Sequence, residues 1–576
     1  MECPHSIIVA IDFGTTYSGV AYARGAEPNH VHFVSNWSSQ DFFCFTKQKV
    51  PTVIYYSPDE SSPKWGYEVD PGQKDALRWF KLLLLDDDHV PDHLKRSKYI
   101  TTAKSLLKKV NKHVTDVIAD YLRLLWKHSL RSIERTIGEN MVRLSAFKVV
   151  VTLPAIWPLY AQIRMHKAIL AAGLLDNRAA GESVLTFLPE PEAAAYAIFH
   201  KMYQRPDMKV QPNSTSTPPI CLCILLINQI GKRNDGFVVC DAGGGTVDII
   251  TYNISRLQPL SFRESVPGDG KLCGAVRLDE AFEHLLNMKL PREVLAALSR
   301  RDRSSIISDN WENGIKVGFT NSEKPWTLVL DQISKANENG KAPKYVLLVG
   351  GFGRSCVLYD YLKQIIRVRY RNVTVLQDEG TDPWTAIRKG AVINRLRRQQ
   401  SLYSARPGLV DSRFSRASIG TLFNTLFDDD IHDIIDKEWS SLECTNQAVD
   451  QIHWFIHKGE VINGNEPTVF EYYQAFTQQP EEVTVDIVYS LEEFPPNRFD
   501  NSIRTLCRMR WSHIPKVSEL QRQINDKGEL FYELSYRIEM VTQGVSQDLQ
   551  IFYNDKIVAA YNVREFPQLG REAEDD

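Results

Sequence analysis

Residues 7–23 read IIVAIDFGTTYSGVAYA, where an apolar run ends at Asp12, a glycine-threonine turn follows, and a second apolar run begins. Residues 236–252 read GFVVCDAGGGTVDIITY and repeat this order, with Asp241 just before a turn of three glycines. Each stretch predicts a strand, a tight turn and a second strand. A near-repeat at this distance along the chain predicts two similar halves that face each other across a cleft, each contributing one glycine turn.

Three further segments accompany this repeat in a fixed order. Residues 148–153, KVVVTL, predict a buried strand between the two glycine turns. Residues 189–202, PEPEAAAYAIFHKM, predict a helix, because alanine and glutamate favour helix and proline suits its first turn. Residues 344–355, KYVLLVGGFGRS, predict a strand, a glycine turn and the start of a helix. This last pattern is typical of nucleotide-binding proteins.

The glycine turns and the aspartates before them predict a phosphate and magnesium site. Backbone N–H groups can converge on phosphates only where no side chain blocks the approach, which favours glycine at 14 and at 243–245. Asp12 and Asp241 end their strands beside these turns, and carboxylates there would repel phosphate unless a cation lay between them. Mg²⁺ keeps most of its waters, so we expect both aspartates to hold it through water.

Composition narrows the class of protein further. The chain has 576 residues, 43% of them hydrophobic and 24% charged, with a formal charge of -3. Such a chain is globular, is long enough for about two to four domains, and lacks the basic excess of nucleic-acid-binding proteins. Its start carries no secretory pattern, and its longest apolar runs, 82–85 and 221–227, fall far short of a membrane span. We therefore expect a cytoplasmic protein with neither nucleic acid nor membrane as a partner.

The chain is predicted to have four parts. They are a nucleotide-binding domain at 1–398 with halves at about 5–200 and 235–398, a basic linker at 399–407, a β-rich domain at 408–565, and an acidic tail at 566–576. The third part rests on short β-branched and aromatic segments between turn residues, typical of an antiparallel sandwich. Residues 209–235 are either a surface insert or an error in the gene model.

The order DFGTTYS, VTLPA, PEPEAAAYA, DAGGGTVD and VGGFGRS resembles the ATPase domain of the seventy-kilodalton heat-shock protein (heat-shock protein 70) family, over about residues 5–398. The intervening sequence is more similar to a divergent branch of that family with an atypical C-terminal domain. The resemblance implies an α/β fold, a duplicated ribonuclease-H-like (actin-like) ATPase domain with two lobes around a nucleotide cleft. Beyond residue 400 the family's helical lid has no counterpart, and its acidic-apolar linker is replaced by a basic stretch.

The resemblance also assigns roles to single residues. Glu190 matches the carboxylate that orients or deprotonates the attacking water, and Thr246 the hydroxyl near the γ-phosphate; helix capping is the alternative for Glu190. The nucleotide-binding set comprises Gly14, Thr15, Thr16, Tyr17, Gly243, Gly244, Gly245, Asp248, Gly274, Gly350, Gly351, Gly353 and Arg354, the last stacking on the base. Asp12 and Asp241 match the metal-water aspartates.

Two further matches leave alternatives open. The family uses a lysine beside the γ-phosphate, and Lys81 in RWFKLLLL is the candidate, with Lys74 as its rival. The alternative for Lys81 is a solvated surface residue. Glu312 and Lys316 in NWENGIKVGF loosely match the helix pair that brackets adenine, over a short sector.

Three functions remain compatible with these residues. The first is a slow ATPase of the chaperone type, with ATP/ADP and Mg as cofactors and with unfolded peptides, client proteins or co-chaperones as partners. The second is a nucleotide-gated scaffold that binds ATP and scarcely hydrolyses it. The third is a small-molecule kinase, because the same fold also phosphorylates sugars.

Overall fold

The computed structural model describes residues 6–561 apart from 28–29, 40–46, 204–233, 258–259, most of 300–326, 379–381, 402–409, 464–466, 512 and 544–545. Several predictions fall outside these residues: Glu312 and Lys316, residues 209–233 of the insert, most of the linker, and the acidic tail. The chain divides into two compact units, residues 1–411 and 412–576.

The first sheet of residues 1–411 is built around β1, which carries the first glycine turn at its end. Its strand order is β3 (His32–Phe33), β2 (Tyr17–Arg24), β1 (Ser6–Phe13), β8 (Ala146–Leu153) and β9 (Val184–Pro189), and β4 (Val50–Pro51) pairs with β2. Strand β1 is antiparallel to β2 and parallel to β8. Every residue of β1 is buried, as its continuous apolar run predicts.

The second sheet repeats this pairing around β10. Within the first unit its order is β14 (Thr374–Gln377), β13 (Pro343–Val349), β10 (Gly236–Ala242), β11 (Val247–Leu257) and β12 (Leu260–Lys271). Strand β10 is antiparallel to β11 and parallel to β13, as β1 is to β2 and β8. Asp12 and Asp241 therefore stand at matching positions, each one residue before the end of its strand.

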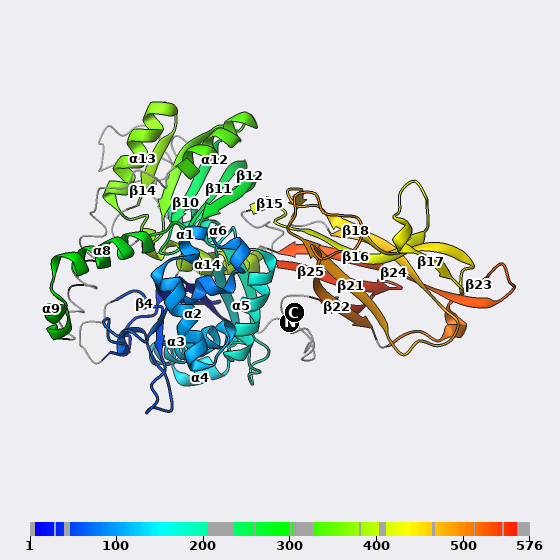
Figure 1. Ribbon diagram of the computed structural model, residues 1–576, viewed down its shortest axis with the longest axis horizontal. Helices are drawn as coiled ribbons and strands as arrows, with labels where there is room; N and C mark the ends of the chain where they lie inside the picture. The colour runs from blue at the N-terminus through cyan, green and yellow to red at the C-terminus, as the bar shows by residue number, and fades with distance from the viewer. Residues whose placement is uncertain are drawn as a thin grey trace. The chain divides into compact units, whose positions relative to one another are not determined.

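Two helices join the sheets, α6 (Glu190–Tyr203) and α14 (Asp382–Ser401) (Figure 1). One buried apolar cluster includes Ile8 and Val150 of the first sheet, Phe237 and Ile250 of the second, and the alanines of both helices. The helices cross closely, because a Cβ on Gly390 would lie 1.6 Å from the Ala193 carbonyl oxygen. The small residues of PEPEAAAYA therefore serve packing as well as helix formation.

The other face of the second sheet is covered by α12 (Thr327–Glu338) and α13 (Cys356–Arg369) (Figure 1). Strand β10 shows the alternation, with Phe237 and Val239 in the cluster of α6 and α14, and Val238 and Cys240 in the cluster of α12 and α13.

The described residues of this unit also form further helices and small strands. They are β5 (Val53–Tyr55), β6 (Lys64–Trp65), β7 (Leu77–Arg78), the 3-10 helix η3 (Phe80–Leu84), α1 (Asp92–Lys95), α2 (Lys98–Val110), α3 (Val114–Ile137), α4 (Glu139–Arg143), α5 (Leu159–Ala171), α8 (Val276–Lys289) and α9 (Arg292–Ala297). Helix α14 continues to Ser401, so three residues of the predicted linker are helical.

The described residues of the second unit form two antiparallel sheets and contain no α-helix (Figure 1). One has the order β17 (Lys437–Ser440), β18 (Thr445–Ile456), β16 (Ser418–Leu426), β21 (Val483–Ser490) and β22 (Arg504–Trp511). The other has β20 (Thr468–Phe476), β24 (Leu530–Gln543), β25 (Ser546–Tyr553) and β26 (Lys556–Tyr561), with β23 (Gln521–Ile524) beside β24. Strand β15 (Val410–Phe414) pairs with β19 (Val461–Asn463).

Across the described parts of both units, none of the helices combines the length and the apolar character that crossing a bilayer requires.

The crossing at Gly390 gives a prediction that opposes helix propensity. Alanine is favoured over glycine inside a helix by about 1 kcal/mol, so on propensity alone Gly390→Ala would stabilise the protein. Because the new Cβ would overlap the Ala193 carbonyl, we expect a loss of about 1–3 kcal/mol in the free energy of unfolding, measured in denaturant.

Gly138→Ala is the comparison for backbone strain without a clash: a Cβ there meets nothing within 4 Å, while the positive φ of 90° makes any side chain costly. A Gly390→Ala protein as stable as the wild type would contradict the close crossing of α6 and α14.

Candidate nucleotide site

A pocket lies where the β1–β2 turn meets the β10–β11 turn, and the space between its walls, including the part open to solvent, is about 750 Å³. Its walls come from both sheets, from η3, and from the first turns of α6 and α14. The lining residues are Asp12, Gly14, Thr15, Thr16, Tyr17, Lys49, Lys81, Glu190, Asp241, Gly243, Gly244, Gly245, Thr246, Ala275, Gly351, Phe352, Arg354, Trp384 and Ile387. Most of the residues predicted from the sequence therefore meet in one place.

The two glycine turns touch each other. A Cβ on Gly244 would lie 2.2 Å from Thr16 Oγ1, and a Cβ on Gly245 would lie 2.3 Å from Thr15 Oγ1. Any side chain at these glycines would therefore collide with the opposite turn. The backbone of both turns remains accessible from the pocket, as cradling a phosphate chain requires.

The remaining predicted glycines support the turns from behind. Gly350 has a φ of +91°, and a Cβ on it would lie 2.2 Å from Asp241 Oδ1. A Cβ on Gly274 would lie 2.5 Å from the Gly244 carbonyl oxygen, and one on Gly353 would overlap the Val349 carbonyl. These three glycines lie outside the pocket lining, where they let neighbouring backbone approach.

Three carboxylates line the pocket, and all are nearly inaccessible to solvent: Asp12 is 3% exposed, Glu190 5% and Asp241 2%. Burial raises the pKa of Asp241 well above its usual value, and the charges of Glu190, Asp248 and Asp12 raise it further. Burial also raises the pKa of Glu190, an effect that Lys81 opposes and Asp12 reinforces. The pocket thus concentrates negative charge that a cation would relieve.

Lysines accompany two of these carboxylates. Lys81 Nζ lies 3.2 Å from Glu190 Oε1, and the ammonium also faces the ring of Trp157 at 5.0 Å. Lys74, the rival from the sequence, is exposed and lies outside the pocket lining. Lys49 Nζ lies 2.5 Å from Asp12 Oδ2, in a second buried ion pair.

Asp248 stands directly opposite Asp241 on the neighbouring strand β11. The Ile156 backbone N–H donates to its Oδ1 at 3.4 Å, while burial, reinforced by the charge of Glu190, raises its pKa to about 7. Asp248 is fully buried and lies outside the pocket lining, so it acts on the lining residues Asp241 and Glu190 through its charge.

The carboxylates fit a magnesium ion that is held through water. Asp241 Oδ1 is buried and has no hydrogen-bond partner among the described residues, so a hydrated cation would satisfy it. The described residues contain no group of three or more His, Cys, Asp or Glu side chains that could ligate a metal directly. Mg²⁺ that keeps its waters does not need such a group.

Aromatic and cationic side chains form another wall. The Arg354 guanidinium lies over the Trp384 ring, 4.8 Å from its centroid, and the Tyr17 ring meets the same indole edge-on at 6.0 Å. Such a wall offers a flat, polarizable surface to a purine base. Arg354 and Tyr17 were predicted from the sequence, whereas Trp384 was read only as the start of a helix.

Sequence reasoning also missed Lys49, Ala275, Phe352 and Ile387. Lys49 comes from KQKVP, a segment with no glycine turn or motif, and it reaches the pocket because β4 pairs with β2. The only available signal was its position near a strand that was not itself predicted.

The buried pair of Lys81 and Glu190 should show strong energetic coupling. Lys81→Met leaves Glu190 unpaired beside Asp241, so we expect a loss of about 3 kcal/mol or more in the free energy of unfolding. In the double variant Lys81→Met/Glu190→Gln neither position carries a charge, so most of that loss should be recovered. Denaturant unfolding of the four proteins in this double-mutant cycle measures the coupling.

The exposed pair of Lys109 and Asp75 serves as the control, because solvent screens it and its coupling should be close to zero. Additive losses for Lys81 and Glu190 would show that the two side chains are not paired.

Comparisons with known proteins agree with this geometry. The chain is 28% identical to heat shock 70 kDa protein 12A of Mus musculus over 318 residues, which are 49% of this chain and 45% of that protein. It is 26% identical to heat shock 70 kDa protein 12B of Homo sapiens over 337 residues, 52% of this chain and 47% of that protein. The chain thus spans about half the length of the curated relatives it matches.

The second unit matches a different description. Residues 413–547 match the family model of a domain of unknown function (DUF8568).

The chain is also 28% identical to heat shock 70 kDa protein 12A of Homo sapiens over 318 residues. The family resemblance seen in the motifs is confirmed: over about half of its length, this chain is a homologue of heat shock 70 kDa proteins 12A and 12B.

Proposed function

We propose that this protein binds ATP in the pocket between the two glycine turns and hydrolyses it slowly to ADP and phosphate. The observation that carries the proposal is the meeting of both turns, three carboxylates and Lys81 in a single pocket. On this proposal the two sheets are the two lobes of an actin-like ATPase domain. The similarity to heat shock 70 kDa proteins 12A and 12B supports the same fold.

In the proposed reaction the two turns hold the phosphate chain from opposite sides. Glu190 orients the attacking water and accepts its proton, a role that requires the carboxylate to be ionised. Lys81 favours the ionised form of Glu190, which burial disfavours, so the pair keeps the base ready in the pocket. Thr246, which is 6% exposed, lies among the lining residues where its hydroxyl can reach the terminal phosphate.

Asp12 and Asp241 would hold Mg²⁺ through its waters, and the metal would neutralise charge on the phosphates. The orphaned Oδ1 of Asp241 supports this assignment. Arg354 and Trp384 would contact the base, and the three glycines behind the turns keep the backbone where the phosphates need it.

A second function, nucleotide binding with little hydrolysis, is favoured by one observation. Asp12 is already paired with Lys49, so one of the two carboxylates expected to hold the metal's waters is engaged. Such a protein would use nucleotide to control a partner.

In the second unit, apolar side chains at residues 426–439 are exposed, with Ile431 at 75% and Trp439 at 57%, next to Asp428 and Asp433. We infer that clients or other partners bind this second unit.

We also propose that the protein is located in the cytoplasm.

Glu190→Gln separates the two functions. The variant keeps the shape of the side chain and loses the base, so under the ATPase proposal turnover should fall about 100-fold or more. Affinity for ATP should change by only a few-fold, because the glycine turns remain intact. Single-turnover hydrolysis and calorimetry on the full chain measure the two quantities.

Glu192→Gln is the matched control, since Glu192 is buried on the same helix and lies outside the pocket lining. Equal turnover in the wild type and Glu190→Gln would overturn hydrolysis through Glu190. Tight ATP binding without measurable turnover in the wild type would favour the second function.

A further inference from the structure

The ion pair of Lys49 and Asp12 is not required by the ATPase chemistry described above. Lys49 Nζ lies 2.5 Å from Asp12 Oδ2. The side chain of Lys49 is 6% exposed and that of Asp12 is 4% exposed, and both residues line the pocket. We propose that Lys49 is a second phosphate-binding lysine, which competes with magnesium for Asp12 and lets the pocket bind nucleotide without the metal. This inference rests on the proposed nucleotide site and adds one property to it, which is nucleotide binding that does not require the metal.

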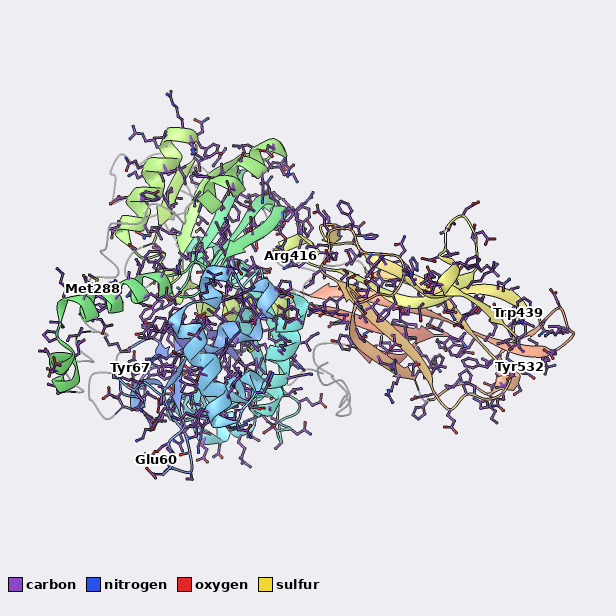
Figure 2. All side chains as sticks on the ribbon, viewed as in Figure 1. Glu60, Tyr67, Met288, Arg416, Trp439 and Tyr532 are labelled. Atoms are coloured by element: carbon purple, nitrogen blue, oxygen red, sulfur yellow. The ribbon has the colours of Figure 1, made fainter. Side chains whose placement is uncertain are left out.

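The position of Lys49 is fixed by its neighbours on the chain. Arg388, fully buried in α14, donates to the backbone carbonyl of Gln48 and, at 2.8 Å, to Gln48 Oε1. The Tyr67 hydroxyl donates to the Lys49 carbonyl oxygen at 3.0 Å, and Tyr67 is labelled in Figure 2. The backbone is thus held on both sides of the Lys49 side chain, which directs the ammonium into the pocket.

Neighbouring residues also fill the space around the Lys49 side chain. A Cβ on Gly19 would lie 3.0 Å from Lys49 Cγ and would overlap the Arg388 guanidinium. The ammonium additionally faces the Trp384 ring, 5.7 Å from its centroid. Lys49 is therefore a packed part of the pocket, unlike a surface lysine that happens to reach a carboxylate.

The charges explain why a lysine belongs here. Asp12, Glu190 and Asp241 converge, and each would repel the phosphates of a nucleotide. Lys49 cancels the charge of Asp12 while the pocket is empty, just as Lys81 cancels that of Glu190. When phosphate enters, the ammonium can bind it as a compact point charge with three donors on a flexible stem.

This arrangement changes what magnesium contributes. In a site that relies on the metal alone, removing it exposes the phosphates to unscreened carboxylates, and affinity collapses. Here Lys49 supplies positive charge at the same carboxylate, so it takes over part of the metal's role. Lys49 already holds Oδ2 of Asp12, so the waters of magnesium compete with the ammonium for this carboxylate. The wild type should therefore depend little on magnesium for affinity.

Calorimetric titration of ADP into the full chain, with magnesium and with excess EDTA, tests the proposal. For the wild type we expect the affinity in EDTA to fall less than about tenfold, because a close buried charge pair supplies comparable energy. For Lys49→Met we expect the affinity for ADP to fall about 30-fold or more when EDTA is added. In magnesium, the affinity of this variant should fall less, relative to the wild type. A wild type that loses about 100-fold or more in EDTA, or a Lys49→Met protein as independent of magnesium as the wild type, would overturn the proposal.

Two further variants show whether a change in ADP affinity comes from a folding defect. Lys49→Met leaves Asp12 buried without its partner, so the double variant Lys49→Met/Asp12→Asn, with neither charge, is measured beside it. It too should lose binding in EDTA relative to the wild type, and retained binding would count against Lys49. Lys148→Met is the control for loss of a buried lysine, because Lys148 lies in β8 outside the pocket lining.

Failure of the nucleotide site itself gives a different result. If the wild type binds no ADP even in magnesium, the proposed function falls, and the inference falls with it. If the wild type binds ADP in magnesium and loses it in EDTA, only the role of Lys49 is wrong.

Discussion

Helices α6 and α14 cross so closely at Gly390 and Ala193 that no side chain fits between them, and this contact sets the spacing of the two sheets. The apolar cluster around the crossing draws residues from both sheets, so the sheets are held through the helices. The same helices carry Glu190 on the first turn of α6 and Trp384 on the first turn of α14 into the pocket. The core and the candidate site thus depend on one packing contact.

That spacing brings the glycine turns together and concentrates charge between them. The contacts of Gly244 with Thr16 and of Gly245 with Thr15 leave space for backbone alone. Asp12, Glu190 and Asp241 then meet in a place from which water is largely excluded. Lys49 and Lys81 offset two of the three charges, while one buried oxygen of Asp241 has no hydrogen-bond partner within the described part of the chain. The pocket therefore offers two ammonium groups to a phosphate chain and one buried carboxylate oxygen to a hydrated cation.

The residues that could be predicted from the sequence are those whose chemistry is local. Asp12 and Asp241 end continuous apolar runs beside glycines, and this pattern predicts both the strands and the turns. Lys81 was found through the family resemblance, since a lysine in such a segment is more often a solvated surface residue. Its contact with Glu190 joins residues 109 positions apart, which no local pattern encodes.

Lys49 and Trp384 were missed for the same reason. Lys49 reaches the pocket only because the two-residue strand β4 pairs with β2, and a strand of that length leaves no periodic signal. The resemblance assigns Gly350 and Gly274 to the nucleotide, and the structure shows in addition that a side chain at either position would crowd the neighbouring backbone or Asp241. A glycine in a motif can serve either purpose, and the sequence does not separate them.

Calorimetric titration of ADP with magnesium into the full chain and into a Gly245→Val variant tests the central claim most directly. The new side chain would overlap Thr15 and fill the space between the two turns. The account predicts saturable binding at one site in the wild type and its loss in the variant, with the melting temperature of the variant measured alongside. Absence of binding in the wild type, or unchanged affinity in a folded Gly245→Val protein, would contradict it.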